Sequence, residues 1–207
     1  KQDQVYIYAG DATGHGVTSG LIGSMTNALM EAFWEVLIEW DRVVSEVNSL
    51  LFTRLYDARI MTLALLRWDT NISRLYLTWA GHEHLLVYRA ESGKIDVYRS
   101  DGIALGMKKD ITRHTHERHI PFGARDRFIL YSDGITEAIR EVDGTKEKYG
   151  LDRLKQAIKN VPDKTPASIF RNVTEDLSSF MGKEFRQKDD ITLVCGGVSL
   201  TGKLSSF

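Results

Sequence analysis

Cysteine, proline and long apolar runs are all scarce in this chain, and two of these absences exclude a class of protein. Among 207 residues there is one cysteine, Cys195, so no disulfide can form within the chain. We expect its thiol to be buried and inert in an apolar strand, which fits a reducing compartment. No apolar run reaches the ~20 residues that cross a bilayer. We therefore expect a cytoplasmic domain without membrane contact, and any sensor or membrane tether would lie upstream.

The charged residues are nearly balanced, which excludes two further classes. Lys and Arg number 27 against 28 Asp and Glu, giving a net charge of −1. No basic stripe indicates a nucleic-acid partner, and no acidic tail indicates disorder. With three prolines and no clear linker, we expect residues 1–207 to form a single domain. Because the first residue is Lys1 and not methionine, we expect an N-terminally truncated fragment of a longer protein.

Helical periodicity predicts four helices that pack against a core. After residue 17, one stripe expected to be buried is Leu21, Met25, Ala28, Leu29, Ala32, Val36 and Trp40. The next helix carries Val44, Val47, Leu50 and Leu51. Two later stripes are Leu151, Leu154, Ile158 and Val161, and, after the helix-starting Pro166, Ile169, Val173, Leu177 and Phe180.

The period changes to that of strands between residues 60 and 131. Residues 60–67 and 73–79 flank one turn signal, and residues 85–89 and 95–98 flank another. Further strands are expected at residues 5–9 (a buried one), 112–120, 127–131 and 191–198. Short connections imply antiparallel pairing, because parallel neighbours need long crossovers. The predicted fold class is α+β, with helices covering an antiparallel sheet or a sandwich of two such sheets.

A glycine-rich segment, residues 10–16 (GDATGHG), separates the first strand from the first helix. Glycine lets the backbone approach an ion closely, so Asp11 could bind one there. The same strand–loop–helix order could cradle a phosphate ester, but neither GxGxxG nor GxxxxGK[ST] is present. A plain strand-to-helix turn is the other alternative.

Two later carboxylate positions also border apolar strands. Asp133 follows residues 128–131, and the pair Asp189 and Asp190 precedes residues 191–194. If these strands are neighbours, the carboxylates meet at a sheet edge, where they repel one another unless a cation neutralises them. Oxygen ligands favour Mg²⁺ or Mn²⁺ over zinc, and no CxxC or HExxH pattern competes. Asp-Gly is also a common turn dipeptide, so turns without a metal remain an alternative.

Seven motifs, taken in order, resemble the SpoIIE/RsbU branch of the metal-dependent (PPM, type 2C-like) Ser/Thr protein phosphatases. Each motif alone is weak, whereas the ordered set is specific and covers nearly the whole chain. The matching segments are residues 10–16 (GDATGHG), 61–63 (MTL), 80–82 (AGH), 105–106 (LG), 130–138 (LYSDGITEA), 149–151 (YGL) and 189–194 (DDITLV).

This resemblance implies an antiparallel two-sheet β-sandwich flanked by helices, with a centre of two Mn²⁺ or Mg²⁺ ions at one end. By motif, Asp11 would bridge both ions and the Ala12 carbonyl would bind the second. Asp133 and Asp189 would hold the first ion, and Asp190 is the less favoured ligand of its pair. The ions would lower the pKa of a water that attacks phosphoserine or phosphothreonine. The implied activity is that of a protein phosphatase.

The chain departs from the family pattern in three places. An earlier strand with a Gly-Gly-Asp motif is missing, so the sandwich is expected to lack its first strand. Ala104 replaces a common proline, and Thr13 stands where type 2C enzymes have a histidine proposed as general acid. We expect His15 to be an ordinary loop histidine instead. His82, although part of a family motif, is expected to be a solvated strand residue.

The resemblance also implies a phosphorylated protein substrate, similar to an anti-sigma-factor antagonist, in bacterial partner-switch signalling. The helices from Val17 to Leu55 lie next to Asp11 in sequence and are expected to form a regulatory switch or a homodimer surface. One alternative is a catalytically weak or inactive phosphatase-like module that binds a signalling partner. Another is an unrelated phosphohydrolase of small phosphate esters, for which no base-stacking or phosphate-loop motif is present.

Overall fold

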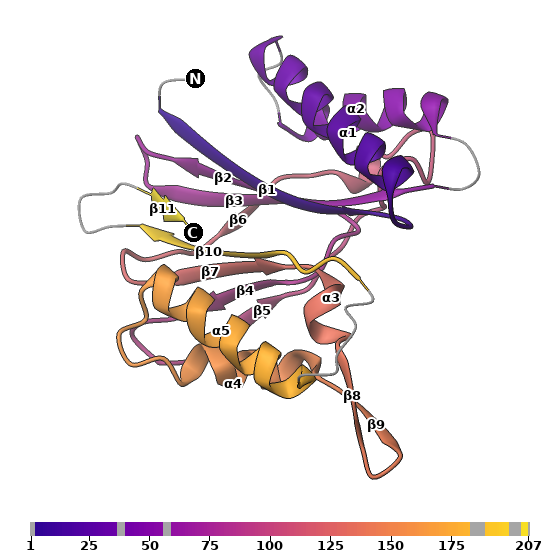
Figure 1. Ribbon diagram of the computed structural model, residues 1–207. Coiled ribbons are helices and arrows are strands. Elements are labelled where there is room, and N and C mark those ends of the chain that lie inside the picture. The colour runs from indigo at the N-terminus through magenta and orange to yellow at the C-terminus, as the bar shows by residue number, and fades with distance from the viewer. Residues whose placement is uncertain (1–2, 37–39, 56–58, 183–188, 199–203, 207) are drawn as a thin grey trace. The chain divides into compact units, whose positions relative to one another are not determined.

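A computed structural model describes residues 3–36, 40–55, 59–182, 189–198 and 204–206 of the chain (Figure 1). The chain divides into two compact units. The first comprises Lys1–His82 and Arg99–Phe122, and the second comprises Glu83–Tyr98 and Gly123–Phe207. Each unit combines helices with an antiparallel sheet, which confirms the predicted mixture of antiparallel sheets and helices.

The first unit contains a sheet with the strand order β1-β2-β3-β6. Its strands are β1 (Gln4–Ala12), β2 (Met61–Asp69), β3 (Arg74–Ala80) and β6 (Arg118–Ile120), and all pairs are antiparallel. The predicted turn after β2 is confirmed. Asp69 Oδ1 accepts hydrogen bonds from the N–H groups of Asn71 and Ile72, the local bonding for which aspartate is favoured in turns.

Two helices, α1 (Val17–Val36) and α2 (Trp40–Arg54), pack against one face of this sheet (Figure 1). Successive strand residues point to opposite faces, so alternate residues of β2 meet the helices. The contacts are Met61, Leu63 and Leu65 from β2, Ile22 and Met30 from α1, and Val43, Val44, Val47 and Leu51 from α2. The predicted stripe of α2 is thus confirmed except at Leu50, which is exposed.

The predicted core stripe of α1 is wrong except at Leu29, which is partly buried against the core, and the side chain of Trp40 lies outside the described ones. The buried residues of this helix are Ile22, Thr26 and Met30, whereas Leu21 and Val36 are 58% and 71% exposed. Thr26 can lie on the buried face because its hydroxyl donates to the carbonyl of Ile22 at 2.9 Å. A helix with apolar residues on several faces offers more than one stripe, and only packing selects between them.

Two strands of the first unit also differ from their predictions. In β1 only Ala9 is buried and Val5 is exposed, because a strand at the end of the sheet order has a neighbour on one side only. The strand predicted at residues 112–120 begins as a 3₁₀ helix, η1 (Thr112–His114), and β6 forms only its last part. Asp110 Oδ1 accepts the N–H of Thr112 at 2.9 Å, which starts the turn.

The second unit contains a sheet with the strand order β11-β10-β7-β4-β5. The strands are β4 (Leu85–Tyr88), β5 (Ile95–Tyr98), β7 (Arg127–Tyr131), β10 (Leu193–Val198) and β11 (Leu204–Ser206). Helices α4 (Gly150–Lys159) and α5 (Pro166–Met181) pack against it. All four predicted stripe residues of α5 are buried, and the helix begins as expected, with Thr165 accepting the N–H of Ser168.

Several short elements of this unit were not predicted. They are α3 (Asp133–Thr136), the hairpin β8 (Ile139–Val142) and β9 (Thr145–Lys148), and β11. The prediction for Cys195 is confirmed, because the residue is fully buried in β10 and burial raises the pKa of its thiol to about 12. Within the described residues, no helix combines the length and apolarity required to cross a membrane.

Candidate metal centre

Asp11 lies near the end of β1, inside the strand and not in the loop where the sequence placed it. It is half-buried and pairs with Thr62 of β2. The two strands are very close at this point, since a Cβ on Gly10 would lie 2.5 Å from the Thr62 carbonyl oxygen and 2.8 Å from Met61 Cε. Only glycine fits before Asp11. The close pairing therefore fixes where Asp11 and the next residue, Ala12, leave the sheet.

The neighbouring threonine and histidines have separate roles. The N–H and hydroxyl of Thr13 both donate to the Ile60 carbonyl, at 2.9 and 3.0 Å, and extend the β1–β2 pairing. His15 is exposed in the following loop, as expected. The prediction for His82 is wrong: it is only 4% exposed and follows β3, so it is a buried residue and not a solvated one.

Asp133 is the first residue of α3, and only Ser132 separates it from the end of β7. Ser132 ties this position to the start of β10, because its hydroxyl donates to the Asp190 carbonyl at 2.9 Å and accepts the N–H of Thr192 at 2.9 Å. Gly134 allows the close approach, since a Cβ there would lie 2.3 Å from the Asp190 carbonyl oxygen. The backbone thus places the two predicted acidic segments of the second unit side by side.

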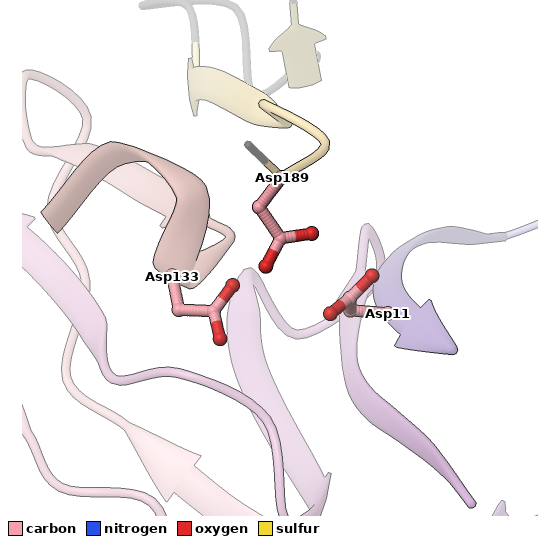
Figure 2. Close-up of side chains that lie close together, drawn as sticks. All are labelled: Asp11, Asp133 and Asp189. Atoms are coloured by element: carbon pink, nitrogen blue, oxygen red, sulfur yellow. The ribbon is translucent and has the colours of Figure 1, made fainter. Parts of the chain in front are cut away.

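As a result, the side chains of Asp133 and Asp189 offer carboxylate oxygens within 4.8 Å of each other (Figure 2). Asp189, not Asp190, is the member of its pair beside Asp133. The N–H of Asp190 donates to Asp189 Oδ1 at 2.9 Å, which helps to orient that carboxylate. Figure 2 also shows Asp11, which belongs to β1 of the first unit.

The surroundings of Asp133 fit a divalent cation. Burial, together with the charges of Asp189 and Glu137, raises the pKa of Asp133. Its Oδ1 atom is buried and has no hydrogen-bond partner within the described residues. A buried carboxylate oxygen without a donor is costly, and a hard cation between two carboxylates satisfies the oxygen and relieves the repulsion. The residues present therefore fit Mg²⁺ or Mn²⁺.

A fourth acidic side chain, Glu83, was not identified from the sequence. It lies two residues before β4, is half-buried, and is hydrogen-bonded to the Tyr131 hydroxyl. Burial and the negative charges of Asp133 and Glu137 raise the pKa of Glu83, whereas His84 opposes them. Its position directly after the residue 80–82 motif was the one available signal.

Comparison with known proteins gives a family match over almost the whole chain. The model described as "Stage II sporulation protein E (SpoIIE)" matches residues 1–198. A search of curated proteins finds no match.

Solved structures share the fold. The PP2C phosphatase domain with a regulatory-domain fragment of SpoIIE from Bacillus subtilis is 20% identical, with a TM-score of 0.79, covering 95% of this chain and 54% of that one. The RsbU and RsbW domains of Rv1364c from Mycobacterium tuberculosis are 16% identical, with a TM-score of 0.71, covering 93% and 51%. The catalytic domain of the serine threonine protein phosphatase PstP, in complex with two manganese ions, is 15% identical, with a TM-score of 0.64, covering 94% and 87%. The chain therefore spans about half the length of the first two.

The close β1–β2 pairing leads to a first prediction. Replacing Gly10 with alanine forces a Cβ against the Thr62 carbonyl, so Gly10→Ala is expected to lower the melting temperature measured by circular dichroism. The matched control is Gly20→Ala in α1, where a Cβ would meet no atom within 4 Å. This control is expected to be stabilised by up to about 1 kcal/mol, because alanine favours helix. Equal melting temperatures for the two variants would contradict the argument.

The environment of Asp133 leads to a second prediction. A carboxyl whose pKa is raised by folding disfavours the folded state as the pH rises above its unfolded pKa. In chelator at pH 7, Asp133→Asn is therefore expected to melt at a higher temperature than the wild type, with the difference shrinking toward acid pH. The control Asp101→Asn changes an exposed carboxylate and is expected to melt like the wild type. A wild type more stable than Asp133→Asn at pH 7 without metal would show that the two carboxylates do not repel each other.

Proposed function

The chain belongs to the Stage II sporulation protein E (SpoIIE) family, and from this premise we propose that it is a metal-dependent serine/threonine phosphoprotein phosphatase. The observation that carries the proposal is the pairing of Asp133 with Asp189 around an unpartnered buried oxygen. A site of this kind suits a divalent cation. It has the features neither of a nucleotide-binding loop nor of a thiol nucleophile.

The proposed centre holds two Mn²⁺ or Mg²⁺ ions. Asp11, Asp133 and Asp189 would hold these ions, with Asp11 shared between them, and the Ala12 carbonyl would serve as a further ligand. Asp190 supports the centre through its hydrogen bond to Asp189. The manganese ions of the PstP complex support this choice of metal. When bound, the ions supply an activated water as nucleophile and neutralise charge on the phosphoryl oxygens.

The protein's own residues agree with direct hydrolysis by water. Cys195 is fully buried and burial raises the pKa of its thiol to about 12, so it does not act as a nucleophile. His15 is exposed beyond β1 and Thr13 is bonded to the Ile60 carbonyl. We therefore assign neither residue the role of general acid.

The substrate that we propose is a phosphorylated protein similar to an anti-sigma-factor antagonist, in a cytoplasmic bacterial partner-switch pathway. The likeness to the RsbU and RsbW domains of Rv1364c supports a regulatory protein partner. An inactive module that only binds such a partner is the competing function, and the presence of all three aspartates argues against it.

We further propose that α1 pairs with α1 of a second copy within the region Val17 to Leu55. Val17, Leu21 and Met25 are spaced four residues apart and are 81%, 58% and 36% exposed, so they line one face of the helix. A two-fold contact would bury this face on both copies at once. Dimer formation would then affect Asp11 through this surface, which lies next to β1.

Activity measurements test the proposed centre. Wild-type protein, and a version extended at its N-terminus, are assayed with Mn²⁺ on p-nitrophenyl phosphate and on a phosphoserine peptide. Asp133→Asn is expected to lose at least about 100-fold in rate, because each metal contributes several kcal/mol of charge stabilisation in the transition state. Asp101→Asn is expected to retain wild-type activity. Two inactive wild-type forms that also bind no Mn²⁺ would favour the binding module instead.

Sedimentation equilibrium tests the dimer. The wild type is expected to sediment as a dimer and Leu21→Glu as a monomer, because a charge cannot be buried at an apolar interface without a partner. Ile72→Glu places the same charge at a residue that is 54% exposed in the β2–β3 turn, and it is expected to leave the dimer intact. A monomeric wild type at tens of micromolar would refute this part of the proposal.

A further inference from the structure

Thr62 connects Asp11 with His82 through three contacts, all within the first unit. The Asp11 N–H donates to Thr62 Oγ1 at 3.1 Å, and the Thr62 hydroxyl donates to the Asp11 carbonyl oxygen at 3.2 Å. The same Oγ1 lies 2.9 Å from His82 Nδ1. One hydroxyl on the central strand β2 therefore contacts both backbone polar groups of Asp11 and one imidazole nitrogen.

The hydrogen count of the hydroxyl determines how these contacts are arranged. A threonine hydroxyl has one hydrogen to donate and two lone pairs. If His82 Nδ1–H donates to Oγ1, the hydroxyl accepts from His82 and from the Asp11 N–H, and donates to the Asp11 carbonyl. All three contacts are then satisfied. If the hydroxyl instead donates to His82, its bond to the Asp11 carbonyl is lost. The arrangement that satisfies all three contacts of the hydroxyl therefore places the imidazole proton of His82 on Nδ1.

The position of the His82 ring is fixed by its surroundings. The side chain is 4% exposed, and burial lowers the pKa of the imidazole to about 4, so the ring is neutral near pH 7 and carries one N–H. Gly81 adopts φ +71°, and a Cβ there would lie 3.0 Å from the Ala104 backbone nitrogen. Gly81 also forms a bridge to Leu63, the residue after Thr62. The turn that presents His82 is therefore packed against its neighbours.

We propose that His82 is a positioning residue for the metal centre: through Thr62 it holds the backbone of Asp11, and so directs the Asp11 carboxylate and the adjacent Ala12 carbonyl toward the ions. This inference rests on the metal-dependent function proposed above. In this proposal His82 is not itself a metal ligand, because its Nδ1 is hydrogen-bonded to Thr62. Among the described residues it also belongs to no cluster of three or more His, Cys, Asp or Glu side chains that could hold an ion. Partners of this kind typically change metal affinity by about 10- to 100-fold when removed.

Paired substitutions test each link of this connection, with Mn²⁺ affinity measured by electron paramagnetic resonance titration and apo stability measured by thermal unfolding in chelator. Thr62→Val removes the hydroxyl and keeps the shape, and it is expected to weaken Mn²⁺ binding about 10- to 100-fold. Thr62→Ser keeps the hydroxyl and is expected to bind Mn²⁺ much more tightly than Thr62→Val.

The same logic applies to the imidazole. An asparagine amide reaches the position of Nδ1, whereas a glutamine amide reaches that of Nε2. His82→Asn is therefore expected to retain more Mn²⁺ affinity than His82→Gln, although both introduce an amide at a buried position. A merely structural histidine would give equal Mn²⁺ affinities for the two variants, whatever their melting temperatures.

A double-mutant cycle separates positioning from independent effects. Because His82 acts through Thr62, the variant carrying both Thr62→Val and His82→Gln is expected to bind Mn²⁺ no more weakly than Thr62→Val alone. Additive losses would overturn the inference, as would wild-type affinity in Thr62→Val.

Measurements on the wild type and on Asp11→Asn distinguish a failure of this inference from a failure of the proposed phosphatase function. If the wild type binds Mn²⁺ and Asp11→Asn does not, but the Thr62 and His82 variants bind like the wild type, the inference is wrong and the proposed phosphatase function stands. If the wild type binds no Mn²⁺ and hydrolyses no phosphate ester, the proposed function is wrong and the inference is overturned with it.

Discussion

The repulsion between Asp133 and Asp189 is the constraint on which the candidate centre depends. Two carboxylates within 4.8 Å of each other, one of them with a buried oxygen that has no partner within the described residues, are unfavourable in the absence of a cation. The fold maintains them because the backbone around Ser132 and Gly134 fixes both segments. Other interactions in the second unit therefore have to offset this local repulsion, as is typical of functional sites.

Close backbone approach is the device that both units use to place their acidic residues. In the first unit, Gly10 lets β1 lie against the carbonyl of Thr62, one residue before Asp11. In the second unit, Gly134 lies against the carbonyl of Asp190, one residue after Asp133. A side chain at either glycine would push apart the segments that carry these aspartates. The glycine next to each aspartate therefore helps to position it as much as the contacts of the aspartate itself do, because glycine has no side chain.

The two units differ in how completely their helices are buried. In the second unit the apolar stripe of α5 is fully covered, which fits a scaffold that only has to hold Asp133 and Asp189. In the first unit α1 leaves Val17 and Leu21 exposed beside the loop that follows Asp11. An apolar helix face next to the strand that carries Asp11 is a natural point for a partner to influence that strand, because burying the face changes the packing of α1.

Much of the fold could be predicted from the sequence, because local patterns and turn chemistry act over a few residues. The hairpin turn at Asp69, the capped start of α5 at Thr165 and the buried strand around Cys195 were all predicted for this reason. The short α3 and the β8–β9 hairpin were missed, since four-residue elements carry little periodic signal. Among the acidic residues of the candidate site, the ordered motifs pointed to Asp11, Asp133 and Asp189 but passed over Glu83.

What the sequence by itself determined was therefore the inventory: antiparallel strands, four main helices, and aspartates at strand ends in the order of a phosphatase family. Only the tertiary structure decided which face of α1 is buried, that His82 is enclosed, and that Asp189 and not Asp190 lies beside Asp133. These outcomes depend on contacts between residues far apart in the chain. Hydrogen-bond satisfaction and close packing act on such contacts only after the strands have paired, so no local pattern could encode them.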